Sequence, residues 1–137
     1  MTRLLQLLLL VSCSTLAGLA SEKSNTVLIH PGEVIYARFT QSGAKLRLVK
    51  ASPAKDDNAQ LVLTLDPVIK GKKDYLINLK VENRFKNDIH YEAQMRSLAL
   101  NKHMSATVFP VVAGKISLVP FLPVVDEVAL WGFELEL

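Results

Sequence analysis

The sequence predicts an all-β protein in which short antiparallel strands pack as a single β-sandwich domain. Apolar and polar residues alternate with a period of two along segments rich in Val, Ile, Leu and Tyr. Turn-forming pairs such as Pro31-Gly32, Ser42-Gly43 and Ala113-Gly114 separate these segments at short intervals. No segment carries the apolar stripe and the capping residues of an amphipathic helix. These three observations favour a sandwich over a helical or mixed fold.

Nine strands are expected in order along the chain. Strands of this length and spacing predict an immunoglobulin-like sandwich, although the two cysteines that flank the core tryptophan of antibody domains are absent. Trp131 is therefore expected to be a core or edge residue of the last strand. The predicted strands cover residues 26–29, 33–39, 44–50, 60–65, 74–82, 88–97, 107–112, 115–119 and 128–137.

The alternation also predicts which side chains face the core, and it is clearest in three strands. The two longest, 74–82 and 88–97, are joined by the short polar loop 83–87. They either pair directly as a hairpin or cross from one sheet of the sandwich to the other. The side chains predicted to point inward are Leu61, Leu63, Leu65, Tyr75, Ile77, Leu79, Val81, Ile89, Tyr91, Ala93 and Met95.

The N-terminal segment predicts export from the cytoplasm. Arg3 precedes a short apolar run, and Gly18-Leu19-Ala20 places small residues where a signal peptidase cuts. We therefore expect a cleaved signal peptide over residues 1–20 and a β-sandwich domain over residues 21–137. The alternative is a signal of residues 1–12 with a lipid on Cys13, because Leu10-Val11-Ser12 fits the residues before a lipidated cysteine. The apolar run is shorter than the ~20 residues of a membrane-spanning helix, so no transmembrane span is expected.

Cys13 is the only cysteine, so the domain has no disulfide. This favours a bacterial envelope, periplasmic or extracellular, over a eukaryotic secretory setting, where small domains are rich in disulfides. The net charge of +3 is too small for a nucleic-acid-binding domain, which would need a basic patch in a far more basic chain. Lysines crowd the middle of the chain, whereas the charged residues after Lys115 are all acids, which we interpret as different faces of one domain. These acids are Asp126, Glu127, Glu134 and Glu136.

The usual components of a catalytic site are missing from the sequence. There is no Gly-x-Ser-x-Gly elbow, and the six glycines are scattered singly at turns instead of forming a phosphate-binding loop. The adjacent acids Asp56-Asp57 and Asp126-Glu127 fall in expected loops, where solvated carboxylates are common. The sequence therefore predicts no catalytic residue and no bound cofactor.

A metal site is the main alternative to a purely protein-binding function. His103 and Met104 are adjacent in the expected loop 101–105, and imidazole and thioether ligands both suit copper. His90 and Met95 are separated by an odd number of residues, so they would point to opposite faces of their strand. The histidines show no established metal-ligand spacing, and isolated histidines are more often ordinary surface or turn residues than metal ligands.

Two features suggest a surface for a protein partner of the cell envelope. The first is a polar stripe on the outer face of the strand 88–97, which otherwise would be the ordinary solvated face of a sheet. The second is the apolar segment 119–125, whose two prolines exclude a regular central strand. It is either buried as a connection between sheets or exposed as a contact loop. A partner would then bind at this loop or at an open sheet edge. The residues concerned are His90, Glu92, Gln94 and Arg96 in the stripe, and Phe121, Leu122 and Val124 in the apolar segment.

Overall fold

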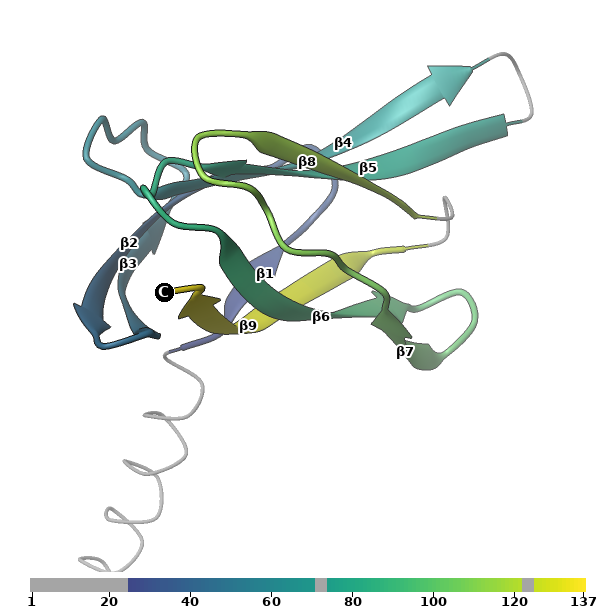
Figure 1. The fold of residues 1–137 in the computed structure, drawn as a ribbon. Coiled ribbons are helices and arrows are strands. Elements are labelled where there is room, and N and C mark those ends of the chain that lie inside the picture. The colour runs from purple at the N-terminus through teal and green to yellow at the C-terminus, as the bar shows by residue number, and fades with distance from the viewer. Residues whose placement is uncertain (1–24, 71–73, 122–124) are drawn as a thin grey trace, which may run out of the picture.

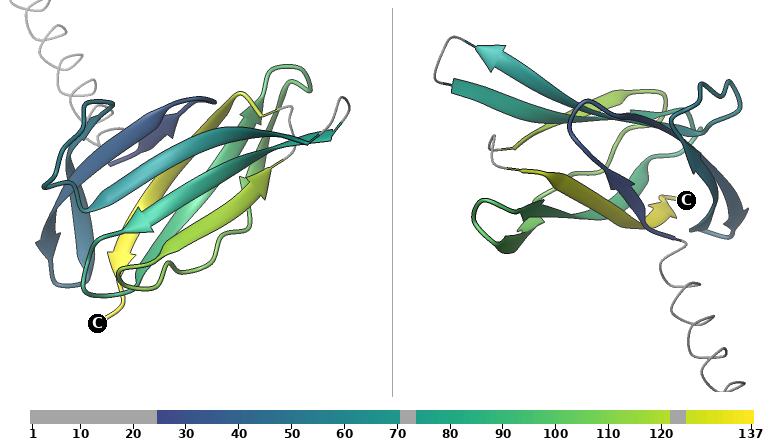
Figure 2. Two further views of the ribbon diagram at one scale, coloured as in Figure 1. Left: turned by 90° about the horizontal axis from the view of Figure 1, so that it is seen from above. Right: turned by 180° about the vertical axis from the view of Figure 1, so that it is seen from behind.

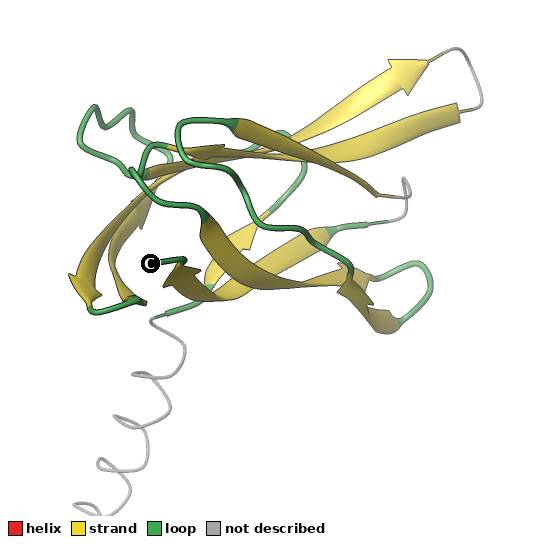
Figure 3. Ribbon diagram, in the orientation of Figure 1, coloured by secondary structure: helices red, strands yellow, loops and turns green. Residues whose placement is uncertain are grey.

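The computed structural model describes residues 25–70, 74–121 and 125–137. The residues in these ranges form antiparallel strands joined by loops and turns, with no helix among them (Figure 3). Accordingly, these ranges hold no helix long and apolar enough to span a membrane. The strands are β1 (Val27–Ile29), β2 (Val34–Ser42), β3 (Lys45–Ser52), β4 (Leu61–Lys70), β5 (Asp74–Asn83), β6 (Ile89–Ser97), β7 (Lys102–Ala106), β8 (Ile116–Phe121) and β9 (Glu127–Leu135).

The strands follow one hydrogen-bonded path that curls over on itself. The order is β7-β6-β9-β3-β2-β4-β5-β8, and β1 pairs with β9 off this path. In Figure 1, β4, β5 and β8 form an upper layer, β1, β6, β7 and β9 lie below, and β2 and β3 form the curved side between them. The link between β3 and β9 is narrow, since only Lys45 and Glu134 pair there. The all-β antiparallel prediction is thus confirmed, whereas the β-sandwich and its immunoglobulin-like arrangement stay predictions.

The core fills the space between the two layers. As predicted from the alternation, Leu61, Leu63 and Leu65 of β4 are fully buried, and the other inward positions of β5 and β6 whose burial the structure describes lie in or against the same cluster. Full burial of each such side chain stabilises the fold by about 1.5–3 kcal/mol. On the opposite layer Phe133 packs against Phe39, with their ring centroids 5.0 Å apart. The core therefore bridges β2, β4 and β9, which are distant in the sequence.

A bulge in β9 shifts the inward positions by one residue. Val128 and Leu130 face the core before the bulge, and Phe133 and Leu135 face it afterwards. On β6 the register moves from the His90–Glu134 pair to the Glu92–Trp131 pair, so β9 holds one extra residue. Gly132 has a φ of 65°, a left-handed conformation that side chains rarely adopt. The bulge leaves Trp131 half-buried on the outer face.

One strand prediction was wrong and another was too short. The predicted strand 107–112 is a connection that holds a single bridge, between Val111 and Ile89, while β7 occupies the expected loop 101–105. β7 lies at a sheet margin, where polar residues are compatible with pairing on one side only. β4 continues through Asp66 and Pro67, beyond residue 65 where the predicted strand ended. Pro67 is tolerated because β2 pairs with β4 only as far as Thr64, so no ladder bond is lost on that side.

β5 and β6 do not form a hairpin. β5 pairs with β4 and β8, whereas β6 pairs with β7 and β9, so the chain crosses between layers at the loop 83–87. Asn83, which is fully buried, holds this crossing together. Its Nδ2 donates to the carbonyl oxygens of Val111 (2.9 Å) and Asn87 (3.0 Å), and its Oδ1 accepts from the Phe85 N–H. Of the two alternatives left open by the sequence, the crossing is the one that the structure has.

Candidate functional site

The outer edge of β8 is open along its length. Among the described residues, β8 forms a ladder only with β5. The hydrogen bond from the Asn83 N–H to the Lys115 carbonyl shows which backbone groups of β8 point toward β5, because the N–H and C=O groups of successive residues point to alternate sides of a strand. Ser117, Val119 and Phe121 therefore bond to β5, and the backbone groups of Ile116 and Leu118 point away from it. Figure 2 shows β8 at the margin of the layer that holds β4 and β5.

The side chains on this edge are apolar and exposed. Ile116 is 51% exposed and Leu118 is 63% exposed, and β8 contains no charged residue. Phe109 and Val112, in the connection that leads to β8, are exposed as well. Isolated exposed apolar residues are ordinary, but an uncharged strand with an open backbone edge is the arrangement that pairs with another strand. The predicted strand 115–119 corresponds to β8, but Ile116 and Leu118 were not predicted as site residues. The sequence feature that could have indicated them is the absence of any charged residue between Lys115 and Asp126.

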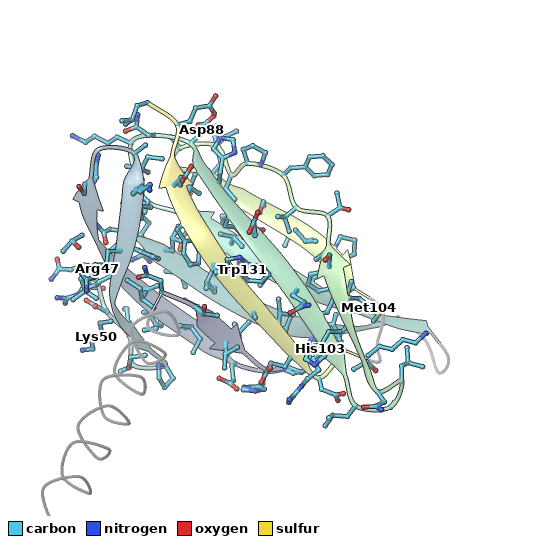
Figure 4. All side chains as sticks on the ribbon, turned by 90° about the horizontal axis from the view of Figure 1, so that it is seen from below. Arg47, Lys50, Asp88, His103, Met104 and Trp131 are labelled. Atoms are coloured by element: carbon cyan, nitrogen blue, oxygen red, sulfur yellow. The ribbon has the colours of Figure 1, made fainter. Side chains whose placement is uncertain are left out.

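Two other open edges of the sheet, those of β3 and β7, carry positive charge. β3 has a largely free edge beyond Lys45, and it presents Arg47 and Lys50 there, with a bulge opposite Arg38 and Phe39 (Figure 4). β7, at the far end of the strand order, begins with Lys102 and His103. Charged side chains and bulges on edge strands hinder pairing with another chain. β8 lacks both devices, with Pro120 as its one residue unable to donate a backbone bond.

In the described part of the apolar segment 119–125, the side chains that face the core are buried. Phe121 is 5% exposed and Val125 is 2% exposed, so both belong to the core. Pro120 pairs with Asn78 in the ladder, and its missing N–H lies on the open edge of β8. For Phe121, burial is the correct alternative and an exposed contact loop is not. Leu122 and Val124 lie outside the described residues.

The polar stripe of β6 has the predicted orientation. His90 and Glu92 are exposed on the outer face, and Gln94 and Arg96 are partly so. Neighbouring acids of the last strand and C-terminus partner two of them: His90 Nε2 lies 3.3 Å from Glu136, and Arg96 lies 3.6 Å from Glu127. Exposed pairs of this kind contribute little to stability. A recognition role for the stripe stays a prediction.

The structure places His103 and Met104 next to each other on β7. Because successive side chains of a strand point to opposite faces, His103 is exposed while Met104, opposite Met95, is half-buried on the core side. Figure 4 shows both residues at the margin of the sheet. The described ranges contain no group of three or more His, Cys, Asp or Glu side chains placed to hold a metal ion. The copper site therefore stays a prediction.

The most connected ionic cluster surrounds His30. Its Nε2 lies 2.9 Å from Glu127, and its Nδ1 lies 2.6 Å from Glu33. The hydrogen bond with Glu127, with a further contribution from Glu33, raises the pKa of His30 above its usual 6.5. The cluster ties the turn between β1 and β2 to the start of β9. We interpret it as a structural clasp, since its partners satisfy one another.

Comparison with protein-family models, with curated protein sequences and with solved structures finds no match for this chain. The function proposed below therefore rests on the geometry and exposure of the described residues. The predicted signal peptide and Cys13 lie outside the described residues, so export and lipid attachment are carried forward as proposals.

Proposed function

We propose that the chain is an exported, non-catalytic β-sandwich module, of immunoglobulin-like type, that binds a protein partner of the cell envelope by strand addition at β8. The observation that carries the proposal is the open, uncharged edge of β8 with exposed Ile116 and Leu118. Sheet edges that accept a strand in this way use backbone bonds for affinity and side-chain pockets for specificity. The signal-like N-terminal segment supports the location, with Cys13 as the point of a lipid anchor in the alternative form.

The contrast among edges supports the choice of β8. Lys and Arg side chains accompany the free edges of β3 and β7, whereas β8 carries no cationic residue. In the described ranges β1 also pairs with one strand only and is uncharged, but it spans just three residues. A partner strand would bond to the free N–H and C=O groups of Ile116 and Leu118 and to the Pro120 carbonyl. Each backbone bond contributes about 0.5–1.5 kcal/mol net, so these bonds alone give weak binding. The remaining affinity would come from covering the exposed faces of Ile116 and Leu118.

Photo-cross-linking in the native envelope tests this proposal. A photoreactive amino acid at position 118 should give a discrete adduct with a partner, and Ile116→Lys in the same chain should abolish that adduct. Val49 is the matched control, because it is 62% exposed, as Leu118 is at 63%, but lies on β3, whose neighbouring residues are basic. The same photoreactive group at position 49 should give no discrete adduct.

Two results would overturn the proposal. One is equal adduct formation from positions 49 and 118, which would show non-specific contact. The other is amide exchange at Leu118 as slow as at Ser117 and Val119 in the isolated protein, which would show that the edge is already covered. Loss of the adduct through misfolding is distinguished by the exchange pattern of β5, which Ile116→Lys should leave unchanged.

A further inference from the structure

A second opening lies on the other layer, where β7 leaves β6. β6 pairs with β7 as far as Ala93 opposite Ala106, and the next contact on this side is the bridge from Ile89 to Val111. Between these points the connection 107–110 bows away from β6. The N–H and C=O of Ile89 both bond to Val111. Tyr91 lies two residues further along β6, so its N–H and C=O point to the same side of the strand. There they face the opening, with no ladder partner among the described residues.

This opening is a hollow of about 440 Å³, here called the β6–β7 pocket. Trp131, half-buried, and Glu92, exposed, stand opposite each other across β6 and β9 and share its wall. Ser105 and Thr107 line it from the β7 side. Figure 4 shows Trp131 in the middle of the face that β6 and β9 form. The pocket therefore combines an aromatic ring, a carboxylate and a stretch of free backbone.

The charge around the pocket is negative. A neighbouring hollow of about 450 Å³ shares Tyr91 and Glu92 and is lined further by His90, Gly132 and Glu134. No Lys or Arg lines either hollow in the described ranges. Gly132 presents no side chain to this hollow, and a Cβ there would lie in ordinary contact, 3.7 Å from the Glu92 side chain. A carboxylate beside an indole favours a planar cation, through ion pairing together with the attraction of the ring for positive charge.

We propose that the β6–β7 pocket binds the arginine side chain of a peptide, with the guanidinium group between Glu92 and Trp131 and the adjoining peptide backbone bonded to Tyr91. The guanidinium group suits the site better than an ammonium group, because it is planar, stacks on aromatic rings and forms two parallel bonds to a carboxylate. The free N–H and C=O of Tyr91 match the C=O and N–H of one extended residue. This site is independent of β8, so each proposal can fail without the other.

The fluorescence of Trp131, the only tryptophan in the chain, reports occupancy of the pocket. The probe is N-acetyl-arginine amide, titrated against the full-length protein. N-acetyl-citrulline amide is the matched control ligand, since it has nearly the same shape and no charge. Methylguanidinium supplies the charge without the peptide backbone. We expect saturable fluorescence change with the arginine probe, weaker binding of methylguanidinium and no saturation with the citrulline probe.

Two variants test the assigned residues. Glu92→Gln keeps the shape and removes the charge, and it should weaken the arginine probe by about fivefold or more, as expected for loss of one favourable ion pair. Glu82→Gln, on the outer part of β5 in the other layer, should leave the affinity unchanged. Equal binding of the arginine and citrulline probes would refute a cation site. Undiminished binding to Glu92→Gln would refute the assignment of Glu92, and equal affinity for methylguanidinium would refute the contact with Tyr91.

Discussion

Replacing Asn83 with Ala should destabilise the fold more than its single side chain suggests. Asn83 is fully buried and makes three hydrogen bonds at the crossing from β5 to β6. Asn83→Ala removes all three, although the Val111 carbonyl keeps its bond from the Ile89 N–H. Each of the three lost bonds contributes about 0.5–1.5 kcal/mol, so together they contribute about 1.5–4.5 kcal/mol. The expected loss is therefore about 3 kcal/mol.

The loss is measured as the change in the free energy of unfolding in urea, followed by Trp131 fluorescence. Asn87→Ala is the matched control, because it removes the same side chain from the same loop. The Asn87 side chain makes one exposed bond, to the Glu136 carbonyl at 3.1 Å. We expect it to cost less than about 1 kcal/mol. A domain of this size has a total stability of about 5–15 kcal/mol, so the two variants are easily distinguished.

The reasoning fails if Asn83→Ala costs no more than Asn87→Ala. It also fails if the loss is large but amide exchange at Ile89 and Val111 is unchanged relative to the rest of the sheet. Those two residues bond to each other directly beside Asn83, through Ile89 N–H to Val111 O and the reverse. Their protection should fall more than that of β2 if Asn83 holds the connection against β6.

Three further predictions follow from titratable groups. Burial raises the pKa of Tyr91 to about 12, so the spectroscopic transition that is lost in Tyr91→Phe should lie near that pH. Since the Tyr91 hydroxyl has no hydrogen-bond partner in the described structure, Tyr91→Phe should not destabilise the protein, and a loss above about 1 kcal/mol would contradict this. The pKa of His30 is raised, mainly by Glu127, so the pairing contributes stability that is present below about pH 6.5 and is lost as the pH rises through the folded pKa. Glu127→Gln should therefore lower the His30 pKa measured by NMR and should destabilise more at pH 5 than at pH 8.5, and an unchanged His30 pKa would count against the clasp. The hydrogen bonds from Arg38 lower the pKa of Asp56 from 3.8, so Asp56→Asn should destabilise at pH 7 and have progressively less effect as the pH falls below 3.8, whereas a pH-independent effect would contradict the ion pair.

Most of the fold could be predicted from the sequence because alternation is a local property. The strand at 60–65, with its leucines on one face, needs only its own residues to identify the buried side. The same holds for β5 and the first half of β6, where Ile77, Leu79 and Ile89 are buried as predicted. Pairing partners are not local. The loop 83–87 is equally compatible with a hairpin and with a crossing, and the choice depends on Asn83 and Val111, which meet only in the folded chain.

The candidate site was harder to predict because it depends on what is absent beside a strand. Ile116 and Leu118 alternate with Ser117 and Val119, a pattern that fits a central strand as well as an edge. Only the sheet order shows that β8 has one neighbour. The β6–β7 pocket was missed for a related reason, since the bulge at Gly132 and the departure of the connection 107–110 are irregularities that period-two patterns do not reveal.

The open edges of β3, β7 and β8 differ in a way that protein stability does not require. The core lies between the layers, and the outer positions of β3, β7 and β8 contribute little to it. We therefore expect Leu118→Lys to cost little stability, since the edges of β3 and β7 already carry Arg47 and Lys102. An uncharged open edge nevertheless carries a cost in the isolated protein, because it invites pairing with other chains. Such a cost is offset where the edge has a specific partner. The free edge of β8 is therefore more informative about function than any polar group on this surface.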